Sequence, residues 1–128
     1  MRATISTFDQ ETGSIRSICL HDCGSVPRFF AILKQQYGYQ EAVDALIALG
    51  DLSTIAMRLN PAQGSSHSFD DPEPDVILAY HRDRGEKLKI QNSSDWSEYA
   101  DYIRNEIVNV VFDGKAWKLY FHTALIEV

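Results

Sequence analysis

Two alternations of polar and apolar residues open the chain and predict a β-hairpin. Residues Thr4–Phe8 and Ser14–Ile18 both change character with a period of two, as strands with one buried face do. The polar segment 9–13 between them ends in Gly13, which suits a turn that needs a positive φ. The first two strands of a sheet are therefore expected here.

After the first hairpin the apolar residues are spaced as on one face of a helix, which predicts two helices. Ser25 is a suitable N-cap for a first helix, whose apolar face continues to Tyr37 before the helix ends at Gly38. A second helix is predicted over Gln40–Leu49 and ends at Gly50. Two helices joined by so short a turn form a helical hairpin, which would cover one face of a sheet.

The middle of the chain combines an irregular stretch with the strongest strand signal. Residues 51–59 fit neither period, and residues 60–74 are rich in Pro, Gly, Ser and Asp, which indicates a long loop. The apolar run Val76–Tyr80 predicts a central strand, and Lys87–Ile90 alternates as a second strand. The charged segment 81–86 between them is predicted to be the turn of a hairpin.

The last third of the chain predicts one more helix and one more hairpin. Ser94 would cap a helix that extends to Asn105. Strands are expected at Ile107–Phe112 and Ala116–Phe121, joined by the turn Asp113-Gly114, whose residue types strongly favour a hairpin.

Together these elements predict one α+β domain over residues 1–128. Strands linked by hairpins or helices give an antiparallel sheet of about five to six strands, with the helical hairpin and the third helix packed on one face. Composition agrees, because 45% apolar and 23% charged residues are typical of a globular chain. No apolar run approaches the roughly 20 residues that span a bilayer, and no secretory signal is recognisable, so a cytoplasmic protein without membrane contact is expected.

The net charge of −6 narrows the range of partners. Nucleic-acid binders neutralise phosphates with Lys and Arg, so direct nucleic-acid binding is not expected. An acidic surface can instead approach a basic protein surface, including another protein's nucleic-acid groove, although it is also an ordinary solvated surface. The two cysteines, Cys19 and Cys23, are too few for a disulfide scaffold and are expected to be reduced thiols.

His21 and Asp22 end the second predicted strand, between Cys19 and Cys23. One interpretation makes a cysteine the nucleophile and His21 its base. Adjacent strand residues point to opposite faces, however, and a base must reach the proton of its nucleophile. A structural histidine or a binding contact is therefore the favoured interpretation.

Arg82, Asp83, Arg84 and Glu86 form the densest cluster of charge in the sequence. Arginine side chains bind phosphates and carboxylates in a bidentate manner, so a small anion or an acidic partner could dock there. Alternatively, the two carboxylates neutralise the two arginines in an exposed turn. Asp51 follows a helix-ending glycine, where an Asp usually caps the next element, and it is kept as a further binding candidate.

His67, Asp70 and Asp71 carry metal-ligand atoms within one loop, and His21 or His81 could add a further donor. Nothing in the sequence fixes the geometry of these groups, and Asp beside Pro is ordinary turn chemistry, so no metal is expected. The chain also lacks a Gly-rich phosphate loop, a nucleophile elbow, a zinc-protease helix and a dinucleotide fingerprint. Neither a cofactor nor an enzymatic activity is therefore expected.

Several segments together resemble a group of small proteins encoded by bacteriophages and prophages. The likeness lies in residues 1–6, in Ile15–Ile18 followed by His21 and Gly24, in Leu46–Ser53 and in Ala79–Glu86. Between Cys19 and Pro27 the chain departs from the pattern of this group, because Leu20, Asp22, Cys23 and Ser25 stand where aromatic residues are expected. The resemblance implies an origin on a mobile element.

Small phage-borne domains without catalytic motifs often bind and block a host-defence component. The leading hypothesis is therefore a host-defence inhibitor, an anti-CRISPR protein that blocks an effector complex and so has a CRISPR-Cas component as its partner. Alternatives are a sponge for a nucleotide-derived defence signal, with Arg82 and Arg84 holding phosphate, and a small hydrolase that uses His21. Self-association stays open. The candidate residues for ligand or partner binding are His21, Asp22, Asp51, Arg82, Asp83, Arg84 and Glu86.

Overall fold

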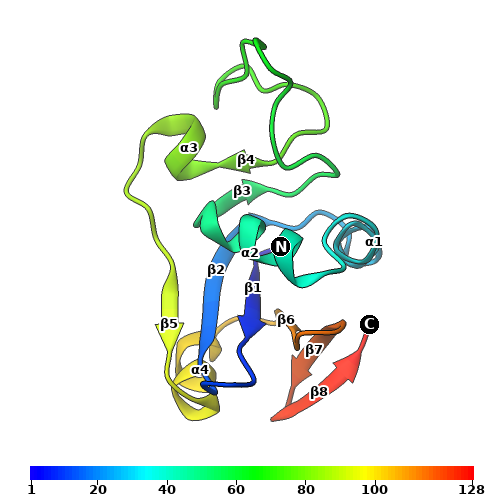
Figure 1. The fold of residues 1–128 in the computed structure, drawn as a ribbon, viewed down its shortest axis with the longest axis vertical. Helices are drawn as coiled ribbons and strands as arrows, with labels where there is room; N and C mark the ends of the chain where they lie inside the picture. Colours follow the sequence, from blue (N-terminus) through cyan, green and yellow to red (C-terminus); the bar gives the residue numbers. More distant parts are fainter.

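A mixed sheet of eight strands forms the framework of the computed structural model, which describes residues 1–128 (Figure 1). The strands are β1 Ala3–Phe8, β2 Ile15–Asp22, β3 Leu52–Thr54, β4 Leu78–Ala79, β5 Gln91–Ser93, β6 Val108–Phe112, β7 Trp117–Phe121 and β8 Ala124–Glu127. Their order is β4-β3-β2-β1-β6-β7-β8, and β5 pairs with β2. The helices are α1 Val26–Gln36, α2 Gln40–Ala48, α3 Tyr80–Arg84 and α4 Trp96–Ile103.

The elements with local sequence signals are confirmed. The first hairpin places Ile5 opposite Ile18, and the last one joins β6 to β7 through the predicted turn at Asp113. Helices α1 and α2 form the helical hairpin, with Ser25 as the N-cap of α1. Helix α4 is shorter than predicted, and Asp95 rather than Ser94 is its N-cap.

Two strand pairs are parallel, which corrects the expectation of a purely antiparallel sheet. Strand β1 runs parallel to β6, with Ile5 opposite Val110, and β2 runs parallel to β3, with Leu20 opposite Leu52. Strands β2 and β3 are connected through α1 and α2, and a connection of this length lets the chain re-enter the sheet in the same direction. Alternation indicates which face of a strand is buried but not the direction of its neighbour, so this pairing could not be predicted.

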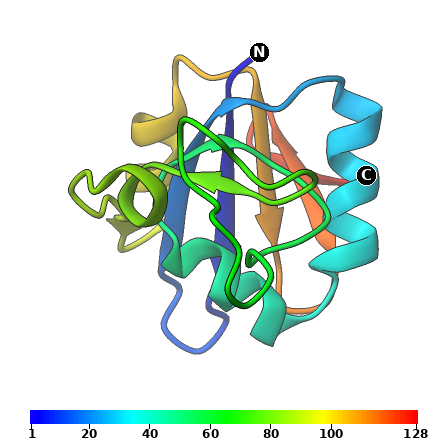
Figure 2. The same cartoon turned by 90° about the horizontal axis from the view of Figure 1, so that it is seen from above.

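Helices cover both faces of the sheet, so the molecule has three layers and not the two that were expected (Figure 2). The larger core packs α1 and α2 against one face, which includes Ile5 and Ile18. A smaller core packs α4 against the other face through Tyr99, Ile15 and Val111. None of the helices is both long and apolar enough to cross a membrane.

The sheet face beneath α4 is rich in small polar side chains. Thr4 donates a hydrogen bond of 2.7 Å to Asn109, and the hydroxyls of Ser6 and Ser17 lie 2.6 Å apart. All four residues are buried. In the sequence these residues have the polar character of a solvent-facing strand surface, which explains why the third layer was not predicted.

The charged segment was wrongly predicted to be a hairpin turn. Within the expected strand, Leu78–Ala79 pairs with β3 and Val76 forms an isolated bridge with Arg58, while residues 80–84 form the short helix α3. This helix ends at Gly85, whose φ is 73°. The expected strand Lys87–Ile90 is an extended connection, and the next strand is β5, which pairs with β2.

Strand β8 was not predicted. It pairs with β7 through a turn in which His122 and Thr123 have φ values of 48° and 64°. Turns with two positive φ values usually contain Gly, Asn or Asp, so this turn has no sequence signal. Figure 1 shows β8 and α4 toward one end of the molecule and loop 60–75 projecting beyond β3 and β4 at the other.

Connection 87–90 packs closely on Gly50 at the edge of the sheet, and a substitution of this glycine tests that contact. Its φ is +76°, and a Cβ at this position would lie 2.7 Å from Leu88 Cδ1 and 3.2 Å from the Lys89 carbonyl oxygen. Gly64 has a similar φ of +78°, but a Cβ there would meet no atom within 4 Å. We expect Gly64→Ala to lower the free energy of unfolding by about 1–2 kcal/mol through backbone strain. Gly50→Ala should cost at least about 1 kcal/mol more through overpacking.

Chemical denaturation of both variants measures this difference. Equal losses of stability in Gly50→Ala and Gly64→Ala would contradict the close contact between Gly50 and Leu88.

Candidate functional site

An ion pair at the start of the charged segment, with the Asp83 side chain 4% and the Arg82 side chain 24% exposed, fixes both ends of loop 60–75. Arg82 Nε donates to Asp83 Oδ1 at 2.8 Å. The Nη1 and Nη2 groups of Arg82 donate to the carbonyl oxygens of Leu59 and Ile77, each at 2.7 Å. Because these two carbonyls lie on either side of the loop in sequence, one guanidinium group holds its two ends together.

His67 attaches the middle of the loop to the same carboxylate. Its side chain is only 2% exposed, and its Nε2 lies 3.3 Å from Asp83 Oδ2, at an angle that falls short of a good hydrogen bond. His67 Nδ1 accepts the N–H of Glu73 at 2.9 Å, so the proton of the neutral ring is on Nε2, toward the carboxylate. Both ring nitrogens therefore face groups of this chain, and no cluster of three or more His, Cys, Asp or Glu side chains is arranged to hold a metal ion.

The charge of Asp83 is stabilised in this setting. Its side chain is 4% exposed, and burial acts to raise its pKa. Hydrogen bonds from Arg82 and from the Ala79 N–H, the nearby His67 Nε2–H and the charge of Arg82 act in the opposite direction and outweigh burial, so the pKa of Asp83 lies below the ordinary value of 3.8. Asp83 is therefore ionised at neutral pH and provides the counter-charge for Arg82.

Asp51 closes a gap at the edge of β2. This strand pairs with β5 up to Ser17 and with β3 from Leu20, so the residues between lack a strand partner on that side. Asp51 Oδ1 accepts the N–H of Cys19 at 2.9 Å within this gap. The carboxylate thus replaces a strand carbonyl, and its position follows from the end of α2 just before it.

Asp51 and Glu86 are brought together at a small cavity of about 130 Å³ between β3 and the end of α3. The cavity is lined by Asp51, Tyr80, His81, Glu86, Lys87 and Lys89. The Glu86 carboxylate forms an ion pair with Arg84. Both carboxylates at the cavity therefore already have partners within the chain.

Arg84 lies over a pair of aromatic rings. Its guanidinium carbon is 4.3 Å from the centre of the Phe69 ring and 5.0 Å from that of Tyr80. The two rings are stacked with their centres 5.5 Å apart. This contact joins loop 60–75 to α3 a second time, although the Arg84 side chain remains 49% exposed.

His21 and Asp22 lie at the end of β2, apart from the Arg82–Asp83 pair. His21 is exposed, while Asp22 Oδ1 accepts the Gly24 N–H at 2.9 Å and the N-terminal ammonium group at 3.3 Å. The bond from Gly24, followed by the bond and charge of the ammonium group, lowers the pKa of Asp22.

The two thiols are not directed at His21. The sulfur of Cys19 lies 3.1 Å from the hydroxyl of Tyr102, and Cys23 donates to the carbonyl of Gly24. Burial raises the pKa of the Cys23 thiol, which disfavours the reactive thiolate.

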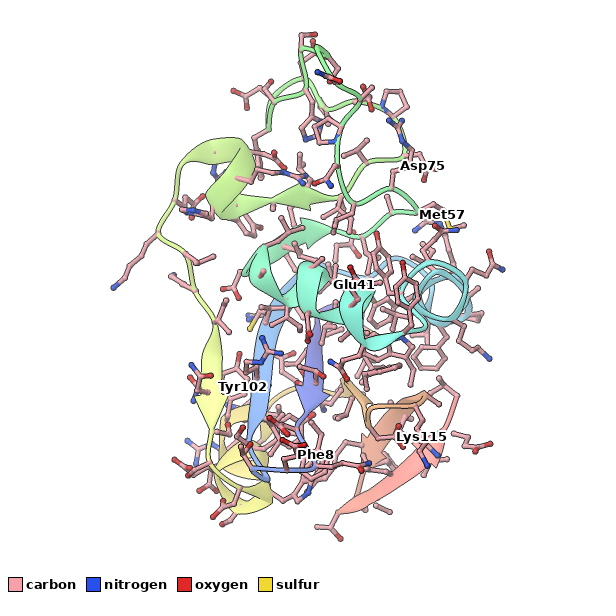
Figure 3. All side chains as sticks on the ribbon, in the orientation of Figure 1. Phe8, Glu41, Met57, Asp75, Tyr102 and Lys115 are labelled. Atoms are coloured by element: carbon pink, nitrogen blue, oxygen red, sulfur yellow. The ribbon has the colours of Figure 1, made fainter.

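Asp22 lines a hollow of about 460 Å³ together with two carboxylates of the loop, Glu73 and Asp75. Asp75 has a positive φ of 61°, and its carboxylate accepts the N–H of Met57 at 3.3 Å, so these two residues meet at the base of the loop (Figure 3). Glu73 forms an ion pair of 2.6 Å with Arg58. Arg28 is the one basic residue that lines the hollow, against three carboxylates, while Arg58 and the N-terminal ammonium group pair with Glu73 and Asp22.

Comparisons with family models, with curated proteins and with solved structures found no match. The site is interpreted from its own geometry for this reason. The role of His67 and the contact between Phe69 and Arg84 were not predicted from the sequence. A histidine and a phenylalanine within a polar loop were the only signals that the loop packs against the domain.

Asp83→Asn tests the anchor of the loop. The variant keeps the size of the side chain but leaves Arg82 without its counter-charge, so we expect a loss of about 2–4 kcal/mol in the free energy of unfolding. Hydrogen exchange across residues 60–75 should become faster. Asp44→Asn is the matched control, because Asp44 pairs with Arg16 at 2.8 Å but both side chains are more than 40% exposed. The control should change stability by no more than about 0.5–1 kcal/mol, and equal losses in both variants would contradict the anchor.

Low pH should destabilise the anchored conformation of the same loop in the unmodified protein. Since the pKa of Asp83 is lowered on folding, its contribution is complete above the unfolded-state pKa of about 3.9 and is lost as the pH falls through the folded-state pKa. Protection factors of the amides in 60–75 should therefore hold at about pH 5 and fall only once the pH is below the unfolded-state pKa. A loss that begins near about pH 6 would contradict this assignment and indicate histidine protonation.

Proposed function

We propose that this protein is a phage-encoded inhibitor of a host-defence effector that acts by binding, as an anti-CRISPR protein acting on an effector complex. The feature that carries this proposal is loop 60–75, an acidic projection that the fold holds in one conformation. The loop would dock on a basic surface of the effector and occlude the groove that receives nucleic acid.

The charge of the loop supports this direction of binding. It contains four of the 18 acidic residues of the chain and none of the 12 Lys and Arg residues. Asp70 and Asp71 are exposed, and Asp22 lies beside Glu73 and Asp75 at the hollow below. A groove that binds nucleic acid must be basic, so an acidic surface is attracted to it and its association is accelerated.

The anchoring of the loop supports the proposal independently of charge. A flexible acidic loop would lose conformational entropy on binding, and that loss would weaken the complex. Here Arg82 holds both ends of the loop and His67 holds its middle. The carboxylates are thus positioned before a partner arrives, which lowers the entropic cost of binding.

The two alternatives draw less support from the geometry. A sponge that holds phosphate with Arg82 and Arg84 would need free guanidinium groups, but Arg82 is occupied by Asp83 and two backbone carbonyls. A hydrolase would need His21 within reach of a nucleophile, and neither cysteine is hydrogen-bonded to it.

The experiment measures binding to purified effector complexes and protection of phage in cells that carry them. We expect the double variant Asp70→Asn/Asp71→Asn to weaken binding at least about tenfold, mainly through a slower association rate that also becomes less sensitive to salt. The control is Glu41→Gln/Asp101→Asn, which removes the same charge from exposed positions on α2 and α4. It should change affinity by less than about twofold.

Two outcomes would reject the proposal. One is that the protein neither binds an effector nor protects phage. The other is that both double variants weaken binding to the same extent, because net charge alone would then account for the effect.

A further inference from the structure

Two lysines, Lys87 and Lys89, line the cavity beside Asp51. Neither Lys87 nor Lys89 forms an ion pair. The two carboxylates at the cavity are used elsewhere, since Asp51 accepts the Cys19 N–H and Glu86 pairs with Arg84. The hydrogen bond from a backbone N–H leaves the charge of Asp51 in place, so the four charged residues that line the cavity, together with Arg84, leave one positive charge in excess.

Both lysines flank the residue that packs this segment on the domain. Residues 85–90 belong to no helix or strand, and Gly85 has a positive φ of 73°. Leu88, between the two lysines, lies on Gly50, where no side chain is present. Lys87 and Lys89, on either side of this contact, both line the cavity.

Tyr80 and His81 add neutral hydrogen-bonding groups. His81 Nδ1 lies 2.7 Å from the carbonyl oxygen of Glu86 and donates to it, which leaves Nε2 free. The ring of Tyr80 is held by Phe69 and Arg84, and its hydroxyl has no partner among the hydrogen bonds of the chain. The site therefore offers two ammonium groups and one hydroxyl as donors, whereas His81 Nε2 is an acceptor in this tautomer.

We propose that this cavity binds the phosphate group of a phosphate monoester. Liquid water occupies about 30 Å³ per molecule, so a cavity of about 130 Å³ holds roughly four water molecules or one phosphate group. The remainder of the molecule would lie outside. A monoester carries close to two negative charges at neutral pH, so an excess of positive charge attracts it more strongly than it attracts the single negative charge of a diester.

This site is separate from the acidic loop and does not depend on the function proposed above. Its ligand approaches positive charge, whereas the effector would approach negative charge. The double variant Asp70→Asn/Asp71→Asn should therefore retain phosphate binding, so the two proposals can fail independently.

The test is titration of the full chain with inorganic phosphate, adenosine 5′-monophosphate, glucose 6-phosphate and cyclic adenosine monophosphate, followed by amide NMR and calorimetry. We expect saturable binding of the monoesters, with shifts centred on residues 80–89 and an affinity at least about tenfold above that of the diester. Tighter binding of the nucleotide than of glucose 6-phosphate would identify a nucleotide as the ligand. Equal affinities for both monoesters and inorganic phosphate would identify the phosphate group alone.

Lys87→Gln/Lys89→Gln should reduce monoester affinity at least about tenfold, and Tyr80→Phe should reduce it about threefold while the spectrum shows an intact fold. The control Lys34→Gln/Lys115→Gln removes two exposed lysines from other parts of the surface and should leave affinity within about twofold. The proposal is overturned if no monoester binds saturably below about 10 mM. Equal losses in the two lysine variants would also overturn it.

Discussion

The ion pair between Arg82 and Asp83 orders a region that apolar packing alone would not order. Loop 60–75 contributes few apolar side chains, and Phe69 packs only on Tyr80 and under Arg84. Removing two charges from water is costly, and here six hydrogen bonds, two of them between Arg82 and Asp83 themselves, offset that cost. The main effect of the pair is therefore to fix the loop in one conformation, and the acidic surface depends on that conformation.

Two sequence segments that lie far apart meet around this pair. Leu52 pairs with Ala79 between β3 and β4, and the Tyr80 N–H donates to the Asp51 carbonyl at 3.2 Å. The segments Leu46–Ser53 and Ala79–Glu86 thus form one structural unit. One side of this unit holds the acidic loop, and the other side forms the cavity with the two lysines.

The sequence predicted those parts of the fold that depend on neighbouring residues. Glycine and polar turns marked two hairpins, and helical spacing marked α1 and α2, because each signal lies within the element itself. Parallel pairing of β1 with β6 joins segments about 100 residues apart, and no local pattern encodes it. The polar side chains of Thr4 and Ser6 suggested a sheet face exposed to solvent, yet α4 covers this face. The cost of burying these hydroxyls is low because they are hydrogen-bonded to Asn109 and Ser17.

In the candidate site, too, the sequence indicates which residue types are present but not which partners they contact. Arg82 and Arg84 are the same residue two positions apart, but one is fully bonded inside the anchor and the other lies half exposed on Phe69. The sequence indicates that a guanidinium is present, whereas its availability depends on carbonyls that the fold brings from Leu59 and Ile77. Lys87 and Lys89 belong to no sequence motif, and their segment was predicted to be an ordinary alternating strand. They became the stronger anion candidates because the fold leaves them without a partner, and only the three-dimensional contacts contain that information.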